Sequence, residues 1–243
     1  MDFYTVFWRE MLVLKRNFYK FFASRLASPL LYLVAFGWGL GRSIQISGGN
    51  YLEFVVPGII ALSAMTTSFN AVGMSLNISR LYHKTMEEYL IAPISACSFV
   101  LGNVLAGSVR GFIASMIILV LAFLFGAGIT VNLWFFLAVL LTCFLFSALG
   151  VTAAMIINSH EDMGNFSTFV ILPMSFLCGT FFSLDQLPAA AAGLIELLPL
   201  THASYSLRAI VSNGDFPLVS LVVLAFYAAA FFITSVLVVQ RVR

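Results

Sequence analysis

Charged residues are scarce in this sequence of 243 residues, and that scarcity excludes most classes of soluble protein. Only 9% of the residues are Asp, Glu, Lys or Arg, whereas 61% are hydrophobic and 25 are phenylalanines. A soluble domain carries roughly 25% charged residues, because polar groups have to cover its surface. The mean hydropathy of +1.04 also excludes a disordered chain. The composition therefore predicts a membrane protein with several spanning helices.

Residues that would perform catalysis or bind metal are equally few. The three cysteines lie in or beside apolar runs without a close pair, which excludes a disulfide-stapled secreted domain. The three histidines lie in three different loops, and neither an H-x-x-x-H nor a C-x-x-C spacing occurs, so we expect no metal site. The nucleophile motif G-x-S-x-G is also missing. We therefore expect a protein that is not an enzyme.

The sequence also lacks the dipeptide Gly-Lys. A phosphate-binding loop ends in Gly-Lys-Ser/Thr, and its backbone amides hold the phosphates of ATP. The three lysines of this chain follow Leu, Tyr and His instead. If the protein depends on ATP, a different polypeptide must therefore hydrolyse it.

Long apolar runs are what the sequence does contain. The longest charge-free stretch, 111–160, is interrupted by a turn signal at Gly126–Asn132. A helix of about 20 apolar residues spans a membrane, and these runs are continuous, without the alternation of a membrane β-barrel. We therefore predict an all-α polytopic membrane protein with six spanning helices. They are expected near residues 24–42, 53–76, 97–125, 133–157, 164–184 and 216–239.

The basic residues are distributed unequally between the two sides that six spans create. Nine of the 12 Lys and Arg residues fall on the side of both termini and two on the other, with Arg110 inside the third span. Cytoplasmic loops of membrane proteins are enriched in Lys and Arg. We predict a multi-pass protein of the cell (inner) membrane with both termini in the cytoplasm. Because topology accounts for the basic residues, we expect no nucleic-acid partner.

The first 23 residues predict an amphipathic helix in the cytoplasmic membrane interface, ahead of a transmembrane domain at 24–243. Apolar side chains recur there at helical spacing, and most of the basic ones lie off that stripe. The stripe consists of Tyr4, Phe7, Trp8, Met11, Leu12, Phe18 and Phe22. An ordinary cytoplasmic extension of the first span is the alternative. Membrane lipid is an expected partner.

A loop with both acidic and apolar positions follows the second span. Residues 82–92 contain no glycine or proline, and Pro93 then blocks continuation of a helix. A short cytoplasmic helix of this kind suits a contact with another protein. A solvated turn that keeps two spans apart is the alternative.

The segment between the fifth and sixth spans is too long for a tight loop and too apolar for a soluble one. Within residues 185–215, helices fit 189–198 and 201–212, with Thr201 as the N-cap of the second. We predict a re-entrant helical pair in the outer leaflet that shapes the outer exit, with a passive cap as the alternative. The residues expected to form the exit gate are Leu194, Leu198, His202 and Arg208.

Arg110 lies well inside the third span, roughly 20 Å along its axis at about 1.5 Å per residue. A charge at the centre of a membrane costs about 2.5–3.5 kcal/mol on insertion scales, so it indicates a function by default. We expect Arg110 to face a translocation path or to pair with Glu53 or Asn103. A satisfied polar contact between packed helices is the alternative.

Three stretches of the sequence carry a family pattern. Residues 85–95 read Thr-Met-Glu-Glu-Tyr-Leu-Ile-Ala-Pro-Ile-Ser, residues 173–188 begin Pro-Met-Ser-Phe and end Leu-Pro, and residues 198–208 contain Pro-Leu-Thr-His-Ala. In order, spacing and six-span plan they resemble the ABC-2 type exporter permeases, including those of nodulation-factor and daunorubicin-type exporters. Lys84 stands where that family usually has glycine, and Cys178 and Ser183 replace a common Ser and Pro.

The resemblance implies a homodimer of this chain bound to two separate ATPase chains, which would hold ATP and Mg. It implies export of an amphiphilic substrate, namely a drug, a lipid or a lipid-linked glycan. The loop at 82–92 would be the coupling helix that contacts the ATPase. The implied contact residues are His83, Lys84, Thr85, Glu87, Glu88 and Tyr89.

Two other classes of function remain as alternatives. One is an ATP-independent channel or ion-coupled carrier, although the predicted spans contain almost no paired ionisable residues that could relay an ion. The other is an intramembrane enzyme, for which the sequence offers no Ser/His, Asp/Asp or metal-binding set. Both alternatives would work without an ATPase subunit.

Overall fold

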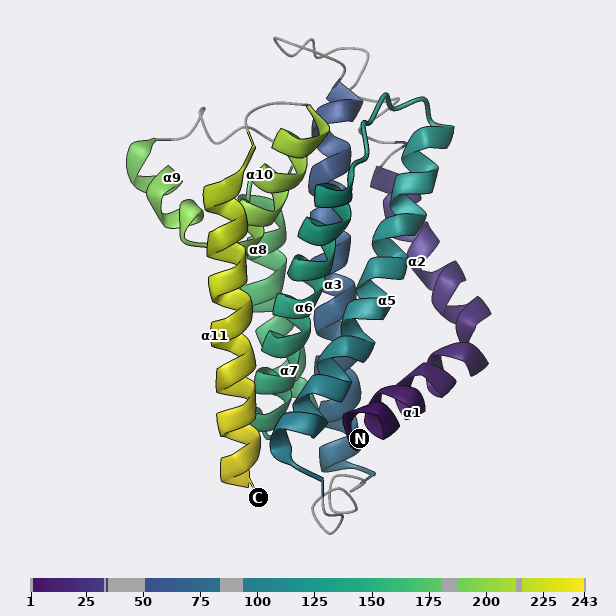
Figure 1. Ribbon diagram of the computed structural model, residues 1–243, viewed down its shortest axis with the longest axis vertical. Coiled ribbons are helices and arrows are strands. Elements are labelled where there is room, and N and C mark those ends of the chain that lie inside the picture. The colour runs from purple at the N-terminus through teal and green to yellow at the C-terminus, as the bar shows by residue number, and fades with distance from the viewer. Residues whose placement is uncertain are drawn as a thin grey trace.

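The computed structural model describes residues 2–32, 34, 51–83, 94–180, 188–212 and 216–242. Every regular element in these residues is a helix, as predicted, and most helices run along the long axis of the molecule (Figure 1). The N-terminal helices are α1 (Asp2–Arg16) and α2 (Phe18–Tyr32). The long helices are α3 (Tyr51–Leu81), α5 (Ala96–Leu124), α6 (Leu133–Ile156) and α11 (Leu218–Val242). The shorter elements are α7 (His160–Phe166), the π-helical segment η2 (Ser167–Ile171), α8 (Leu172–Leu177), α9 (Ala189–Glu196) and α10 (Pro199–Val211).

Among the described residues, four helices are long and apolar enough to cross a membrane. They are α3 from Glu53 onward, α5, α6 and α11, with 29, 29, 24 and 25 residues. At about 1.5 Å per residue, each exceeds the roughly 30 Å thickness of the hydrocarbon core. The predicted second, third, fourth and sixth spans are thus confirmed as helices of spanning length. About half of the predicted first span lies outside the described residues, and the fifth corresponds to the consecutive elements α7, η2 and α8.

The long charge-free stretch is divided where the sequence predicts. Gly126 has a φ of 80°, a backbone conformation that favours glycine, and it follows the end of α5 directly. The amide of Ala127 donates to the carbonyl oxygen of Ala122 at 3.0 Å and so closes the helix end. Asn132 then begins α6, because its side-chain oxygen accepts a hydrogen bond from the amide of Phe135 at 3.0 Å.

Small residues let the three central helices α3, α5 and α6 approach closely. A Cβ atom on Gly150 of α6 would lie 2.9 Å from the carbonyl oxygen of Phe69 on α3. A Cβ atom on Gly107 of α5 would lie 2.5 Å from Oγ of Ser147 on α6. Close backbone approach at small residues is how helices associate when lipid, not water, surrounds them.

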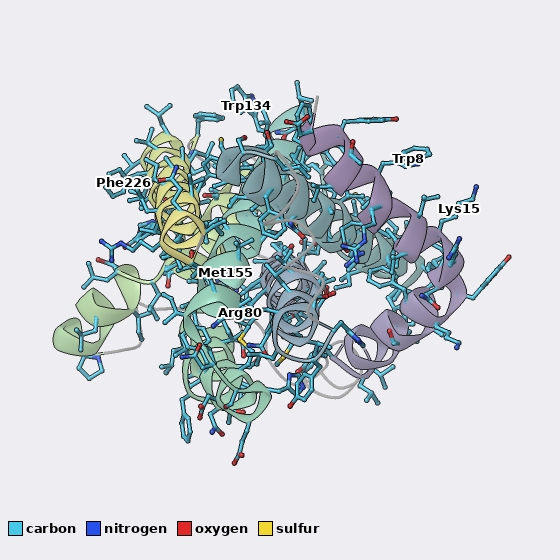
Figure 2. All side chains as sticks on the ribbon, turned by 90° about the horizontal axis from the view of Figure 1, so that it is seen from below. Trp8, Lys15, Arg80, Trp134, Met155 and Phe226 are labelled. Atoms are coloured by element: carbon cyan, nitrogen blue, oxygen red, sulfur yellow. The ribbon has the colours of Figure 1, made fainter. Side chains whose placement is uncertain are left out.

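Helix α11 packs on the outside of α6. On its inner face, the hydroxyl of Ser235 donates to the carbonyl oxygen of Ala148 at 2.8 Å. On its outer face, Phe226 points away from the bundle and is 70% exposed (Figure 2). An apolar face that is exposed among the described residues is available to lipid or to another subunit.

The N-terminal helices α1 and α2 form an elbow beside α5 (Figure 1). Val6 and Leu14 are the buried residues of α1. Tyr4 and Trp8 of the predicted apolar stripe are exposed, and Trp8 points away from the bundle together with Lys15 (Figure 2). Most of the predicted apolar stripe therefore faces away from the bundle, whereas Val6 and Leu14 are buried.

The two ends of the bundle differ in what they contain. Both termini lie at one end, where α3 and α6 finish and α5 begins (Figure 1). The short helices α9 and α10 form a hairpin toward the opposite end, where α3 and α11 begin (Figure 1). These are called below the terminal end and the hairpin end. His83, the described residue of the predicted coupling set, and the predicted exit residues therefore belong to opposite ends.

Candidate functional site

Of the residues predicted to contact an ATPase, His83 is the one that the structure describes, and it belongs to the terminal end. His83 directly follows α3; it is exposed, and its backbone amide donates to the carbonyl oxygen of Ile78 at 3.3 Å. The other predicted contact residues lie outside the described part of the chain; they are Lys84, Thr85, Glu87, Glu88 and Tyr89. The described geometry of this site therefore consists of the last turns of α3 and the turn that follows α6.

Arg80, in the last turn of α3, ties that helix to the end of α6. Its Nη1 donates to the carbonyl oxygens of Ala154, at 2.8 Å, and Met155. Its Nη2 donates to the side-chain oxygen of Asn158, just beyond α6. Figure 2 shows Arg80 beside Met155 near the centre of this end. The last carbonyl groups of a helix have no partner within it and attract a cation, so the guanidinium suits this position.

Asn77, one helical turn before Arg80, makes a second link between the same two helices. Its side chain is fully buried, and its Nδ2 donates to the carbonyl oxygen of Ile157 at 3.0 Å. Neither residue is among the predicted site residues, since Arg80 enters the prediction only as one of the nine basic residues on the side of the termini. The available signal was an amide and a guanidinium three residues apart, which places them on one face of a helix.

The turn after α6 leads directly into α7. Oγ of Ser159 accepts a hydrogen bond from the amide of Asp162 at 2.9 Å and donates to its carboxylate at 2.6 Å. Glu161 and Asp162 are exposed in the first turn of α7, where the helix dipole favours negative charge. The terminal end thus presents an acidic turn, which begins at the residue after Asn158, the side-chain acceptor of Arg80.

Arg110 of α5 pairs with Glu10 of α1, and not with the expected Glu53 or Asn103. Its Nη2 lies 2.9 Å from the carboxylate of Glu10 and donates to the carbonyl oxygen of the same residue, also at 2.9 Å. Its Nη1 donates to the carbonyl oxygen of Ala71 on α3 at 3.2 Å. Arg110 is 8% exposed, so its charge requires a partner inside the protein. The N-terminal helix supplies that partner.

The positions of Glu53 and Asn103 explain why neither pairs with Arg110. Arg110 is level with Ala71, and Glu53 lies in the first turn of α3, about 27 Å away along the helix axis. Nδ2 of Asn103 donates to the carbonyl oxygen of Phe99 at 2.9 Å, within its own helix. Asn103 nevertheless lines, together with Arg110 and residues of α1, a small pocket between α1, α3 and α5.

Arg208 of α10 joins three elements at the hairpin end. Its Nε donates to the carbonyl oxygen of Phe54 on α3 at 3.0 Å, and its Nη2 donates to that of Thr180 after α8 at 2.9 Å. The guanidinium also lies over the ring of Phe54, 3.8 Å from its centroid, which adds a cation–π attraction. A Cβ atom on Gly58 would lie 2.7 Å from the Thr180 carbonyl oxygen, so glycine is needed for this close approach.

The predicted helical pair between the fifth and sixth spans is present as α9 and α10, but Thr201 is not an N-cap. Helix α10 begins at Pro199, because proline lacks an N–H and fits the first helical turn. The hydroxyl of Thr201 instead donates to the carbonyl oxygen of Ile195 at 2.7 Å and closes the corner between the helices. Of the other predicted exit residues, Leu194 is exposed, whereas Leu198 and His202 are half-buried.

The side chains that usually bind metals are dispersed over the described part of the chain. No three His, Cys, Asp or Glu residues come together there in a way that could hold a metal ion. Cys97 is exposed near the start of α5, while Cys143 and Cys178 are buried in different elements. The polar chemistry of the described residues lies instead in the arginine contacts at Arg80, Arg110 and Arg208.

Comparison with known proteins identifies the family. The model of the ABC-2 type transporter family matches residues 1–212. The inner membrane transport permease YadH of Escherichia coli (strain K12) is 31% identical over 218 residues, which are 88% of this chain and 84% of YadH. Nodulation protein J of Rhizobium meliloti (strain 1021) is 30% identical over 246 residues, covering 96% of this chain and 94% of that protein. With its four helices of spanning length, the chain is a multi-pass membrane protein that belongs to the ABC-2 type transporter family.

Proposed function

We propose that the chain is the membrane subunit of an ABC exporter, which moves an amphiphilic substrate outward while a separate ATPase subunit hydrolyses ATP. The observation that carries this proposal is the family match over residues 1–212. Because the sequence contains no Gly-Lys, ATP and its Mg would bind to the partner and not to this chain. The chain would then act as a transport subunit without enzymatic activity of its own.

In this proposal the segment 82–92 is the coupling element. Its contacts with the ATPase would come from His83, Lys84, Thr85, Glu87, Glu88 and Tyr89. Movement of the ATPase can reach the spanning helices only through an element that touches both. The segment follows α3 directly, and Arg80 links α3 to α6, so a force applied here would act on two spanning helices. Glu87 and Glu88 would attract basic residues of the ATPase.

The terminal end would face the cytoplasm in a six-span topology. The excess of Lys and Arg on the side of the termini supports this orientation. The helical run from His160 to Leu177 is about 27 Å long at about 1.5 Å per residue, which is nearly enough for the fifth span. Helix α2 would enter the first span. The four long helices provide the others.

Helix α1 would lie in the cytoplasmic interface of the membrane. Its inner face is held to α5 through Glu10, which supports a fixed position beside the bundle. Tyr4 and Trp8 stack with ring centroids 6.0 Å apart on the exposed side, and aromatic rings favour the headgroup layer. Lys15 and Arg16 are exposed at the elbow, where they would contact anionic headgroups.

The hairpin of α9 and α10 would dip into the outer leaflet as a re-entrant pair and form the outer exit. Non-helical backbone inside a membrane needs internal hydrogen-bond partners. The contacts of Thr201 with Ile195 and of Ser204 with Cys178, at 2.7 and 2.9 Å, provide such partners. Leu194, Leu198, His202 and Arg208 would line the exit.

A second copy of the chain would complete the translocation path. Phe169, Leu172 and Phe176 are exposed on η2 and α8, and the outer face of α11 is exposed as well. Exposed apolar faces of this extent need either lipid or a partner subunit. An amphiphilic cargo suits such a path, since it has both an apolar and a polar part.

Charge reversal in the coupling segment tests the proposed function. We expect the double variant Glu87→Lys with Glu88→Lys to weaken binding of an ABC ATPase subunit from the same genome by at least about tenfold, because removing one member of a buried charge pair costs about 2–5 kcal/mol. The measurement is co-purification of the two subunits and the ATPase activity of the purified complex. Insertion of the variant into the membrane should be unaffected.

The matched control is Glu196→Lys, at the exposed end of α9 near the other end of the bundle. This variant should bind the ATPase as the wild-type chain does. If the double variant also binds it normally, the coupling role of residues 82–92 is rejected. If the wild-type chain binds no ABC ATPase and transports without ATP, the proposed function itself is rejected.

A further inference from the structure

We propose that Arg80 is a positioning residue that joins the two cytoplasmic connections of this end into one mechanical unit, so that the turn at Ser159–Asp162 moves with the coupling segment. The inference rests on the proposed function, because it gives this turn a share in transmitting the movement of an ATPase.

The first step is the geometry of the guanidinium. Arg80 lies in the last turn of α3, two residues before the coupling segment begins at residue 82. Its donors reach acceptors on three residues of one short stretch, namely Ala154, Met155 and Asn158. The guanidinium group of arginine is planar and always charged. This set of hydrogen bonds therefore fixes the orientation of the two helix ends as well as the distance between them. A lysine at this position would keep the charge but could not form all three of these hydrogen bonds.

The second step is the stiffness of the two helices that Arg80 joins. Asn77 adds a bond of 3.0 Å from α3 to Ile157, within one turn of Arg80. Further along the same pair of helices, a Cβ atom on Gly150 would lie 3.1 Å from the backbone nitrogen of Gly73. Backbones in such close contact leave little room for sliding. A displacement of the end of α3 therefore has to move the end of α6.

The third step is the path from Asn158 into the next helix. Asn158 is followed by Ser159, which caps α7 through its bonds with Asp162 at 2.6 and 2.9 Å. From His160 the chain is helical through η2 to Leu177. The turn is thus held by Arg80 on one side and continues into a rigid helical run on the other. Movement received at the end of α3 would reach α7 through Arg80, Asn158 and the capped turn at Ser159.

Two readouts of the assembled complex test this role. Hydrogen–deuterium exchange is measured by mass spectrometry for peptides covering 84–93 and 158–166, with the ATPase subunit bound, before and after trapping with ATP and vanadate. In the wild-type complex we expect both peptides to change on trapping. In Arg80→Lys we expect the change in 84–93 to persist and that in 158–166 to be lost. The ATPase activity per assembled complex should remain.

Amide exchange of the chain without the ATPase subunit complements the measurements on the complex. Arg80→Lys should raise amide exchange around 154–160 by about tenfold, since loss of one charge-assisted hydrogen bond shifts local opening by that order. Asn158→Ala, which removes only the side-chain acceptor, should show a smaller rise. Arg241→Lys, an exposed arginine in the last turn of α11 at the same end, is the matched control and should change neither readout.

The outcomes separate this role from the proposed function. If trapping changes the exchange of both peptides in the wild-type complex and changes it equally in Arg80→Lys, the role of Arg80 is overturned and the exporter function stands. If exchange around 154–160 is unchanged in Arg80→Lys, the role is overturned as well. A uniform loss of complex, in which both peptides and the ATPase activity fall together, would show a merely structural contribution and also overturn it. If the wild-type chain binds no ATPase, both proposals fail.

Discussion

Arg110 shows how a single residue can determine where a helix docks. Its charge is buried among α3 and α5, yet its partner Glu10 precedes it by 100 positions on α1. Nearby, a Cβ atom on Gly102 would lie 2.9 Å from the carbonyl oxygen of Phe3, so α1 also packs closely on α5. A buried pair of opposite charges contributes little net stability, but breaking it leaves an uncompensated charge. The pair therefore fixes the position of α1 more than it strengthens the fold.

Removing either partner of this pair should be costly. We expect Glu10→Gln or Arg110→Gln to lower the free energy of unfolding by about 3–5 kcal/mol. The exchanged pair, Glu10→Arg with Arg110→Glu, should recover part of that loss. The measurement is denaturant unfolding in detergent micelles, analysed as a double-mutant cycle. Glu161→Gln, in an exposed turn, should stay within about 0.5 kcal/mol of wild type. Strictly additive effects at Glu10 and Arg110 would contradict the pairing.

The sequence could identify Arg110 as a residue that needs a partner, but it could not identify the partner. Burial of a charge in a charge-free stretch is visible from composition, whereas Glu10, Glu53 and Asn103 are all acceptable partners until the helices are placed in space. Arg80 illustrates the same limit. Its acceptors are mainly backbone carbonyl groups, which every residue has and which no sequence pattern marks.

At the scale of elements, local signals predict the long helices well and their faces less well. Residues 97–125 were expected to form a span, and α5 runs from Ala96 to Leu124, because apolar content and caps such as Ser95 are local properties. The sequence does not predict which face of α1 contacts the bundle, because Val6 and Leu14 compete with Tyr4 and Trp8 on a helix that is apolar on two sides. The π-helical segment η2 was not expected at all, as its i→i+5 bonds leave no clear sequence signature.

The close packing of α3 and α6 gives a prediction at this scale. Gly150→Ala should lower the free energy of unfolding by about 1–3 kcal/mol, because its Cβ would meet backbone atoms of Phe69 and Gly73 that cannot move aside. Gly193→Ala in α9 is the matched control: nothing lies within 4 Å of its Cβ position. That substitution should be neutral or raise stability by up to about 1 kcal/mol. Thermal unfolding in detergent measures both, and equal losses would contradict the packing of α3 on α6.

At the scale of the whole molecule, α3 connects the two ends. At the terminal end Arg80 joins it to α6, and at the hairpin end Arg208 joins its first turn to α10 and to the residues after α8. Between these points α3 packs against α5 and α6. A helix held at both ends by bonded arginines can carry a displacement from one end to the other with little bending. This arrangement suits a protein in which energy enters at one face of the membrane and cargo leaves at the other.

Such a mechanism requires that the two ends lie on opposite sides of the membrane, and this can be tested on the intact chain. In a background with Cys97, Cys143 and Cys178 replaced by alanine, Glu196→Cys should react with a membrane-impermeant maleimide in whole cells, because α9 lies near the hairpin end. Arg241→Cys should react only after permeabilisation, because the excess of Lys and Arg on this side predicts that the terminal end faces the cytoplasm. Labelling of Arg241→Cys in whole cells would place the coupling segment outside, where no ATP is available to a partner. Labelling of both positions from the same side would show that the two ends are not separated by the membrane.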